Sequence, residues 1–216
     1  EGQAFQKQYP TAKVTFNFAS SSTLRTQLTQ GAKADVFASA DEVNVQQAQA
    51  AGVIDGDRIP FVANQLAIVV SKSSKVVTGL RDLAKPGTKV VLVDPAAPAG
   101  TYADEALAKL AADPQYGQTF ADAVRKNIVT RAGTVRQATL PVETGEVDAA
   151  IVYTTDARVS DKLQAIAFPA SLGIRPLYFM GLVKGAPNAD GGRAFIAFLR
   201  SDAGVQILLK HSFLKP

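Results

Sequence analysis

The sequence contains no cysteine and no tryptophan, and His211 is its only histidine. Without cysteine there can be no disulfide, no thiol nucleophile and no cysteine-ligated metal centre. The lone histidine lies between Lys210 and Ser212, and no Gly-x-Ser-x-Gly motif surrounds any serine, so a nucleophile with its base is not indicated. We therefore expect no enzyme, no cofactor and no metal-cation site, and we interpret His211 as a surface or packing residue.

Long hydrophobic runs and clusters of positive charge are also missing. The longest apolar runs, at residues 66–70 and 177–183, are far shorter than the roughly 18 residues that a membrane-spanning helix needs. The net charge is +4, but the 23 lysines and arginines are scattered without interleaved aromatic residues, so we expect no nucleic-acid partner. With 216 residues, 47% of them hydrophobic, the chain can form one large domain or two small lobes.

Hydrophobic periodicity predicts an alternation of helices and strands near the start of the chain. Phe5 and Tyr9 share one face of a helix that Pro10 ends, and residues 14–18 alternate apolar and polar side chains as a strand does. A hydroxyl-rich segment then opens a helix that Gly31 ends, and a strand follows at 34–40. This order is typical of a parallel sheet with helices on its faces.

Apolar segments without alternation predict strands that are buried on both faces. These segments are residues 66–70, 90–93, 149–153 and 177–183. A helix is predicted to open at Pro98, with Thr101 and Asp104 spaced as a capping box. Two further helices, around residues 195–199 and 205–209, are predicted to close the chain.

Residues 23–41 and 134–156 share one order of features. Each segment reads as a hydroxyl-capped helix, a glycine stop, an aspartate and a buried strand. The similarity indicates either two lobes built alike or the general likeness of α/β units. Pro141 lies inside the second of these helices, where we expect a kink.

Three predicted helices begin with small or hydroxyl residues directly after strands, at 20–23, 99–102 and 134–136. A helix start exposes unpaired backbone N–H groups and the positive end of the helix dipole, and in parallel α/β sheets such starts gather at the carboxyl ends of the strands. Ordinary capping and anion binding are both consistent with these starts.

Four segments together resemble the periplasmic molybdate-binding proteins of ABC transporters, in the family's order and over essentially the whole chain. The segments are residues 18–24, 34–41, 98–103 and 145–157. The resemblance implies an α/β protein with a type II periplasmic-binding fold, in which each of two lobes has a mixed, mostly parallel sheet flanked by helices and the ligand cleft lies between the lobes. Lobe I would comprise residues 1–63 and 175–216, and lobe II residues 64–174.

The resemblance also implies a ligand set for molybdate. Ser21 would donate its hydroxyl and backbone N–H, Ala99 and Val135 their backbone N–H groups, and Tyr153 its phenolic hydroxyl. The residues expected around these four are Ser20, Ser22, Ser39 and Thr101. All of the donors are neutral, and fixed dipoles around a cavity of one size discriminate among anions better than a buried arginine would.

We therefore expect the monomeric substrate-binding component of a molybdate importer, which binds molybdate and tungstate, serves a membrane permease, and is exported to a periplasmic or other extracytoplasmic location. The alternatives are a binding protein for another oxyanion such as sulfate, a ferric-iron binding protein, a ligand-sensing regulatory domain and a hydrolase. The five tyrosines include no adjacent pair of the kind that ferric sites in this fold have, and no helix-turn-helix segment is present.

Members of the resembled family begin with a strand and a loop that carries another oxyanion-binding serine, whereas this sequence opens within the helix that follows. We expect the natural protein to carry a further N-terminal segment with that strand, that serine and an export signal. Residues 113–127 are expected to form a longer surface helix or loop than other members have.

Overall fold

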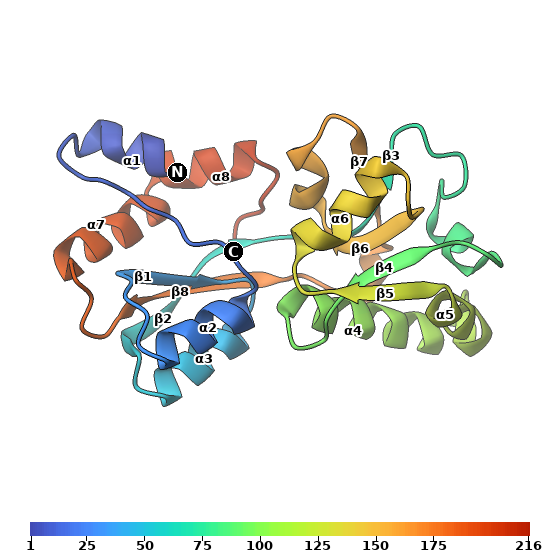
Figure 1. Ribbon diagram of the computed structural model, residues 1–216, viewed down its shortest axis with the longest axis horizontal. Coiled ribbons are helices and arrows are strands. Elements are labelled where there is room, and N and C mark those ends of the chain that lie inside the picture. Colours follow the sequence, from blue (N-terminus) through green and yellow to red (C-terminus); the bar gives the residue numbers. More distant parts are fainter. The chain divides into compact units, whose positions relative to one another are not determined.

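Two separate sheets organise the chain, and the computed structural model describes all of residues 1–216 (Figure 1). Unit 1 consists of Glu1–Ala63 and Leu177–Pro216, and unit 2 consists of Asn64–Pro176. Each unit combines a sheet with several helices, so the mixed α/β class expected from the sequence is confirmed. No helix combines the length and the apolar character that spanning a membrane requires.

Unit 1 has a three-stranded sheet in the order β1-β8-β2, and both of its strand pairs are antiparallel. The strands are β1 (Val36–Ser39), β2 (Ile54–Ala63) and β8 (Leu177–Val183). Helices α2 (Ser21–Thr29) and α3 (Glu42–Ala50) cover one face. The helices α1 (Gly2–Gln8), α7 (Ala189–Arg200) and α8 (Asp202–Lys210) lie on the other face (Figure 1).

The central strand β8 contributes to a hydrophobic cluster on each of its faces. Phe179 and Val183 belong to the cluster that contains residues of α2 and α3. Met180 and Leu182, which point the opposite way, belong to the cluster that contains Phe198 and other residues of α7 and α8. Burial on both faces explains why residues 177–183 show no polar alternation.

The strand predicted over residues 14–18 is wrong, because this segment is irregular. No strand lies beside it in a ladder, and its alternating side chains bury no face. Phe18 is 85% exposed, and its ring stacks on that of Phe16 at a centroid distance of 5.4 Å. A period-two pattern therefore produced no strand here, since a strand also needs a hydrogen-bonding neighbour.

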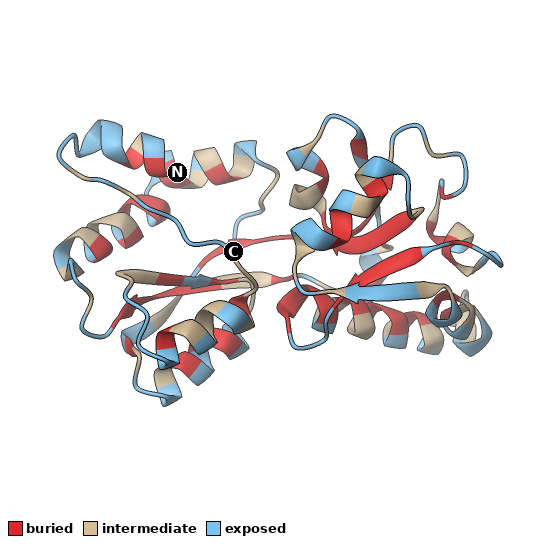
Figure 2. Cartoon of the chain, in the orientation of Figure 1, coloured by how far each residue is buried: buried red, intermediate tan, exposed pale blue.

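Unit 2 has a five-stranded sheet in the order β5-β4-β6-β3-β7. The strands are β3 (Leu66–Ser71), β4 (Val90–Val93), β5 (Ile128–Ala132), β6 (Ala149–Tyr153) and β7 (Leu163–Ala167). Strand β4 is parallel to β5 and β6, whereas β3 is antiparallel to β6 and β7. Figure 2 shows the buried strands β3, β4 and β6 at the centre of this sheet.

The expectation of mostly parallel sheets is wrong, because only the β4–β5 and β4–β6 pairs are parallel. A parallel neighbour requires a crossover of about a dozen residues or more. Unit 2 supplies such crossovers through α4 (Pro98–Ala112) with α5 (Gly117–Lys126), and through α6 (Val135–Thr144). These helices cover the two faces of the sheet, with α6 opposite α4 and α5 (Figure 1).

Three short 3-10 turns complete unit 2. They are η1 (Leu80–Ala84), η2 (Thr154–Val159) and η3 (Ala170–Leu172). Residues 113–127, where a longer surface helix or loop was expected, contain the helix α5. Pro141, where a kink was expected, lies within α6.

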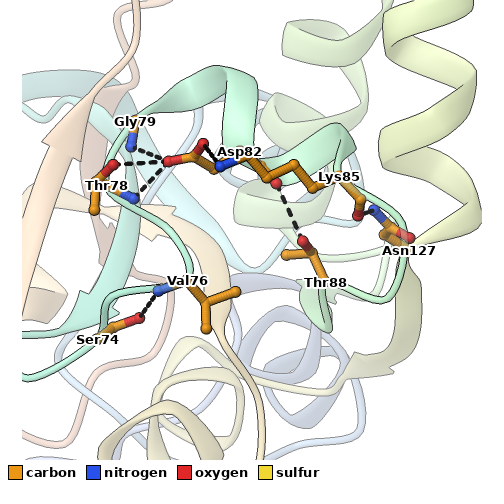
Figure 3. A network of polar contacts seen from close by, with 8 residues as sticks. All are labelled: Ser74, Val76, Thr78, Gly79, Asp82, Lys85, Thr88 and Asn127. Carbon is orange, nitrogen blue, oxygen red and sulfur yellow. Dashed lines mark hydrogen bonds and ion pairs between the residues drawn. The ribbon is translucent and has the colours of Figure 1, made fainter.

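A polar network around Asp82 fixes the turn η1, which leads toward β4 (Figure 3). The backbone N–H groups of Thr78 and Gly79 donate to Asp82 Oδ2 at 2.8 and 3.0 Å, and Lys85 Nζ lies 2.6 Å from Oδ1. The bond from Lys85, followed by those from Thr78, holds the pKa of Asp82 well below its ordinary value. The Asn127 side-chain amide donates to the Lys85 carbonyl at 2.7 Å, which ties the same turn to the end of α5.

Candidate functional site

In unit 1, the serine cluster (Ser20, Ser21 and Ser22) forms the start of α2. Ser20 is the N-cap residue, and its hydroxyl accepts a bond from the Thr23 N–H at 3.3 Å. Ser21 is buried, and its Oγ accepts a bond of 3.0 Å from the Ala40 N–H, just past the end of β1. Because the Ser21 oxygen acts as the acceptor in that bond, its hydroxyl hydrogen can be donated to a further group.

Ser39, the last residue of β1, is 2% exposed and serves the next helix start. Its hydroxyl donates to Asp41 Oδ1 at 3.0 Å, and the same carboxylate oxygen accepts a bond from the Asn44 N–H at 2.9 Å at the N-cap of α3. Ser39 therefore holds the carboxylate that caps α3, beside the serine cluster to which Ala40 is bonded.

In unit 2, the strand-end cluster (Ala99, Val135 and Tyr153) gathers at one edge of the sheet. The parallel strands β4, β5 and β6 have their carboxyl ends at the same edge, with Val93 opposite Ala132. Helix α4 starts after β4, helix α6 starts after β5, and Tyr153 is the last residue of β6. The topology thus brings together three residues that are distant in the sequence.

The start of α4 has Ala97 at its N-cap and no side-chain cap, and Pro98 occupies the first helical position. The buried Ala99 has a backbone N–H that donates to no acceptor within the chain. A β-carbon at Gly100 would overlap the carbonyl of Asp94, so glycine is what allows this helix start to approach the end of β4 so closely.

Helix α4 begins at Pro98, as the sequence predicted, but the predicted capping box of Thr101 and Asp104 is wrong, because the N-cap is Ala97 and no side chain caps the helix. Thr101 instead lies within the helix, and its hydroxyl donates to the Pro95 carbonyl at 2.9 Å. Asp104 lies further along α4 and pairs with Arg131 at 2.7 Å.

The start of α6 is capped by Thr134, whose hydroxyl accepts a bond from the Gln137 N–H at 3.2 Å. This is the hydroxyl cap that the sequence predicted. Val135 follows as the first helical residue and is half-buried. Its backbone N–H is one of the donors at the helix start that have no intrahelical partner.

Tyr153 is buried with 4% of its surface exposed, and the sequence assigned no role to the carboxylate that holds its backbone. The Tyr153 N–H donates to Asp156 Oδ2 at 2.9 Å across the start of η2. Burial raises the pKa of Asp156 to about 6, and the bond from Tyr153 opposes that shift. Asp156 follows Tyr153 by three residues, as the acidic residue of a capping box follows the N-cap, and this spacing could have predicted the bond from the sequence.

Neither cluster contains a charged ligand among its predicted donors, and no group of three or more histidine, cysteine, aspartate or glutamate side chains could hold a metal ion. The donors that the structure presents are hydroxyls and backbone N–H groups at helix starts. Such groups stabilise negative charge without adding a formal positive charge.

The family model of bacterial extracellular solute-binding proteins matches residues 2–214. The chain belongs to this family. Membership places it among proteins that bind solutes outside the cytoplasm. The resemblance found in the four sequence segments is confirmed by this match together with the relatives that follow.

Two curated relatives and one solved structure show which members of the family the chain is similar to. The molybdate-binding protein ModA of Mycobacterium tuberculosis is 34% identical over 217 residues, covering 100% of this chain and 78% of the relative. That of Haemophilus influenzae is 36% identical over 220 residues, covering 97% and 82%. The periplasmic molybdate-binding protein of Azotobacter vinelandii has the same fold, with a TM-score of 0.83 and 21% identity over 100% of this chain and 92% of that one.

Proposed function

We propose that the chain is the substrate-binding component of a molybdate ABC importer. It binds molybdate and tungstate outside the cytoplasm as a monomer and delivers the anion to a membrane permease. The similarity to molybdate-binding proteins extends over essentially the whole chain. Such coverage supports a shared function more strongly than a single shared motif would.

The observation that carries the proposal is the neutral chemistry of the donors at the helix starts. The proposed ligands of the anion are the hydroxyl and backbone N–H of Ser21, the backbone N–H groups of Ala99 and Val135, and the Tyr153 phenol. The structure supports Ser21 as a donor because its oxygen is already engaged by the Ala40 N–H. It supports Ala99 because a buried N–H without an acceptor is costly unless a ligand accepts from it.

Neutral donors suit a protein that must select one oxyanion over others. Sulfate and molybdate carry the same charge, so Coulomb attraction alone cannot separate them. Dipoles held by strand ends and helix starts have fixed positions, and they match one anion size better than another.

The test is a calorimetric and thermal-shift titration of the chain with molybdate, tungstate, sulfate and phosphate. Molybdate and tungstate are expected to bind and to raise the melting temperature by mass action, while sulfate and phosphate do not. Binding of sulfate alone would replace the proposed substrate with another oxyanion, and the absence of any binding would contradict the proposal. Light scattering during the same titration measures the molar mass and so tests whether the chain is a monomer.

A further inference from the structure

Arg136 is the charged side chain next to the proposed donor Val135, at the second position of α6. Its Nη1 lies 3.3 Å from Oε2 of Glu143 on the same helix. The Arg136 side chain is 56% exposed and the Glu143 side chain 19% exposed. The arginine therefore lies at the edge of the strand-end cluster, but its charge is paired further along the helix.

The ion pair directs the Arg136 guanidinium toward the C-terminal end of α6, whereas side chains on a helix ordinarily lean toward its N-terminus. Side chains on a helix lean toward its N-terminus, which is where the unpaired N–H groups are. Glu143 is seven residues further on, which is about 10 Å along the axis at 1.5 Å per residue. Pairing with Glu143 thus draws the guanidinium away from the helix start.

Glu143 is itself held from a second direction. The Ser160 hydroxyl, just after η2, donates to Glu143 Oε1 at 2.8 Å. This bond, together with that from Arg136, lowers the pKa of Glu143, so the carboxylate is ionised at neutral pH. The anchor for Arg136 is therefore charged and fixed in place.

A second arginine near this edge of the sheet shows the same arrangement. Arg131 lies on β5 and donates to both carboxylate oxygens of Asp104 on α4, at 2.7 and 3.1 Å. It also donates to the carbonyl of Val93 at the end of β4, at 3.2 Å. The guanidinium groups of Arg131 and Arg136 are thus both paired with carboxylates of unit 2.

We propose that Glu143 is a specificity-determining residue that acts by holding Arg136 away from the anion. This inference rests on the proposed function of the strand-end cluster. An arginine that reached the helix start would donate to any tetrahedral oxyanion through an adaptable, charged fork, whatever the size of the anion. With Arg136 held by Glu143, the fixed neutral donors alone decide which anion binds.

The test compares Glu143→Gln with the wild-type chain by calorimetry with molybdate and with sulfate, at low and at high salt. Glutamine keeps an oxygen that can accept from Ser160 but removes the charge that holds Arg136. We expect sulfate to bind roughly fivefold more tightly, because the adaptable fork can reach an anion that the fixed donors do not match. Molybdate, which the fixed donors already match, should change less, so that the selectivity ratio falls. The affinity for both anions should also become more salt-dependent, because an exposed cation now contributes to binding.

Two further variants distinguish an effect of the released Arg136 side chain from a general effect of removing one negative charge. In the double variant Glu143→Gln with Arg136→Gln, selectivity and salt dependence should return to wild-type values. The matched control is Glu146→Gln, which removes an exposed carboxylate of the same unit that has no arginine partner and should leave both quantities unchanged. Should Glu143→Gln not fold, Ser160→Ala loosens the same carboxylate and is expected to act in the same direction with a smaller effect.

Unchanged selectivity in a folded Glu143→Gln chain that still binds molybdate would overturn this inference and leave the proposed function intact. The inference would also be overturned if the altered selectivity persisted in the double variant. Failure of the wild-type chain to bind any oxyanion would instead contradict the proposed function itself.

Discussion

The two units position their proposed anion donors by different means. In unit 1 the sheet is antiparallel, and a side-chain bond, from the Ala40 N–H to Ser21 Oγ, joins the helix start to the strand end. In unit 2 the parallel strands β4, β5 and β6 place the starts of α4 and α6 beside Tyr153 through topology alone. The proposed donors of unit 1 therefore include a particular hydroxyl side chain beside the Ser21 backbone N–H, whereas two of the three proposed donors of unit 2 are backbone N–H groups.

This difference predicts where each unit is sensitive to substitution. A backbone N–H cannot be removed by replacing Ala99 or Val135 with another ordinary residue, so unit 2 is best disturbed by moving a helix start. In unit 1, replacing one hydroxyl removes a donor directly. The following predictions test this contrast from the largest expected effect to the smallest.

Gly100→Ala should have the largest effect, because the new β-carbon would overlap the Asp94 carbonyl and push the start of α4 away from β4. We expect a loss of about 3 kcal/mol in the free energy of unfolding and weaker molybdate binding. Urea denaturation and calorimetry measure the two quantities. Gly79→Ala is the matched control in unit 2, since nothing lies within 4 Å of its β-carbon position. Equal stability of the two variants would contradict the close approach of α4.

Asp156 should make the stability of the wild-type chain fall as the pH rises. Its carboxyl group loses its proton near pH 4 in the unfolded chain, but burial delays this to about pH 6 in the folded chain. The folded state therefore binds more protons between these values, and the free energy of unfolding should decrease by about 2 to 3 kcal/mol from this group as the pH rises through that window.

The measurement is urea denaturation of the wild-type chain and of Asp156→Asn at several pH values. Asparagine can still accept the bond from the Tyr153 N–H, but it does not titrate. The difference in unfolding free energy between the two proteins should therefore change between pH 4 and pH 6 and stay constant above pH 7. A difference that is independent of pH would contradict the raised pKa.

Ser21→Ala should weaken molybdate binding by about 1.5 kcal/mol, because it removes a donor and the acceptor that fixes Ala40 beside the helix start. Calorimetry gives the change in affinity. Ser74→Ala removes a serine oxygen that likewise accepts a backbone N–H, from Val76 in unit 2, and should leave the affinity unchanged. If Ser21→Ala lowered only the melting temperature, Ser21 would be a structural residue.

Tyr153→Phe should have the smallest effect, a loss of about 1 kcal/mol in molybdate binding, since two backbone donors of unit 2 remain. The aromatic ring and its burial are kept, so the melting temperature of the unliganded chain should change little. Tyr116→Phe removes a phenol far along the same unit, beyond the end of α4, and serves as the control. A Tyr153→Phe chain with wild-type affinity would remove the phenol from the proposed ligands.

Much of the fold could be predicted where the signal was local. The apolar segments that became β3, β4, β6 and β8 were recognised as buried strands. A hydroxyl-rich start was predicted for α2 within residues 20–23, where Ser20 is the N-cap, and the hydroxyl cap of α6 was predicted at Thr134. Strand β2 had no such signal, because Asp57, Arg58 and Pro60 interrupt it and its register to β8 shifts twice. Its pairing depends on β8, which is more than a hundred residues away in the chain.

The site could be predicted only in part for the same reason. The residue types at the helix starts and the glycine at position 100 are visible in the sequence, and so is the neutral character of the donors. The role of Asp156 was missed because its significance comes from its bond to the Tyr153 backbone and from its burial. The alternation at residues 14–18 led to a wrong strand prediction. Periodicity indicates which face a strand would bury, but it does not show whether a neighbouring strand is available to pair with it.

By itself, then, the sequence determined the hydroxyl-rich starts of α2 and α6, the buried strands and the neutral residue types of the proposed donors, since these follow from side-chain periodicity and from bonds between residues a few positions apart. Only the tertiary structure decided that the Ala40 N–H meets Ser21, and that Ala99, Val135 and Tyr153 share one edge of a sheet. Ser21 and Ala40 are 19 positions apart in the sequence, and the residues that share the sheet edge lie on three different segments of unit 2. Which distant segments pair is decided by the packing of the whole unit, and no local pattern encodes it.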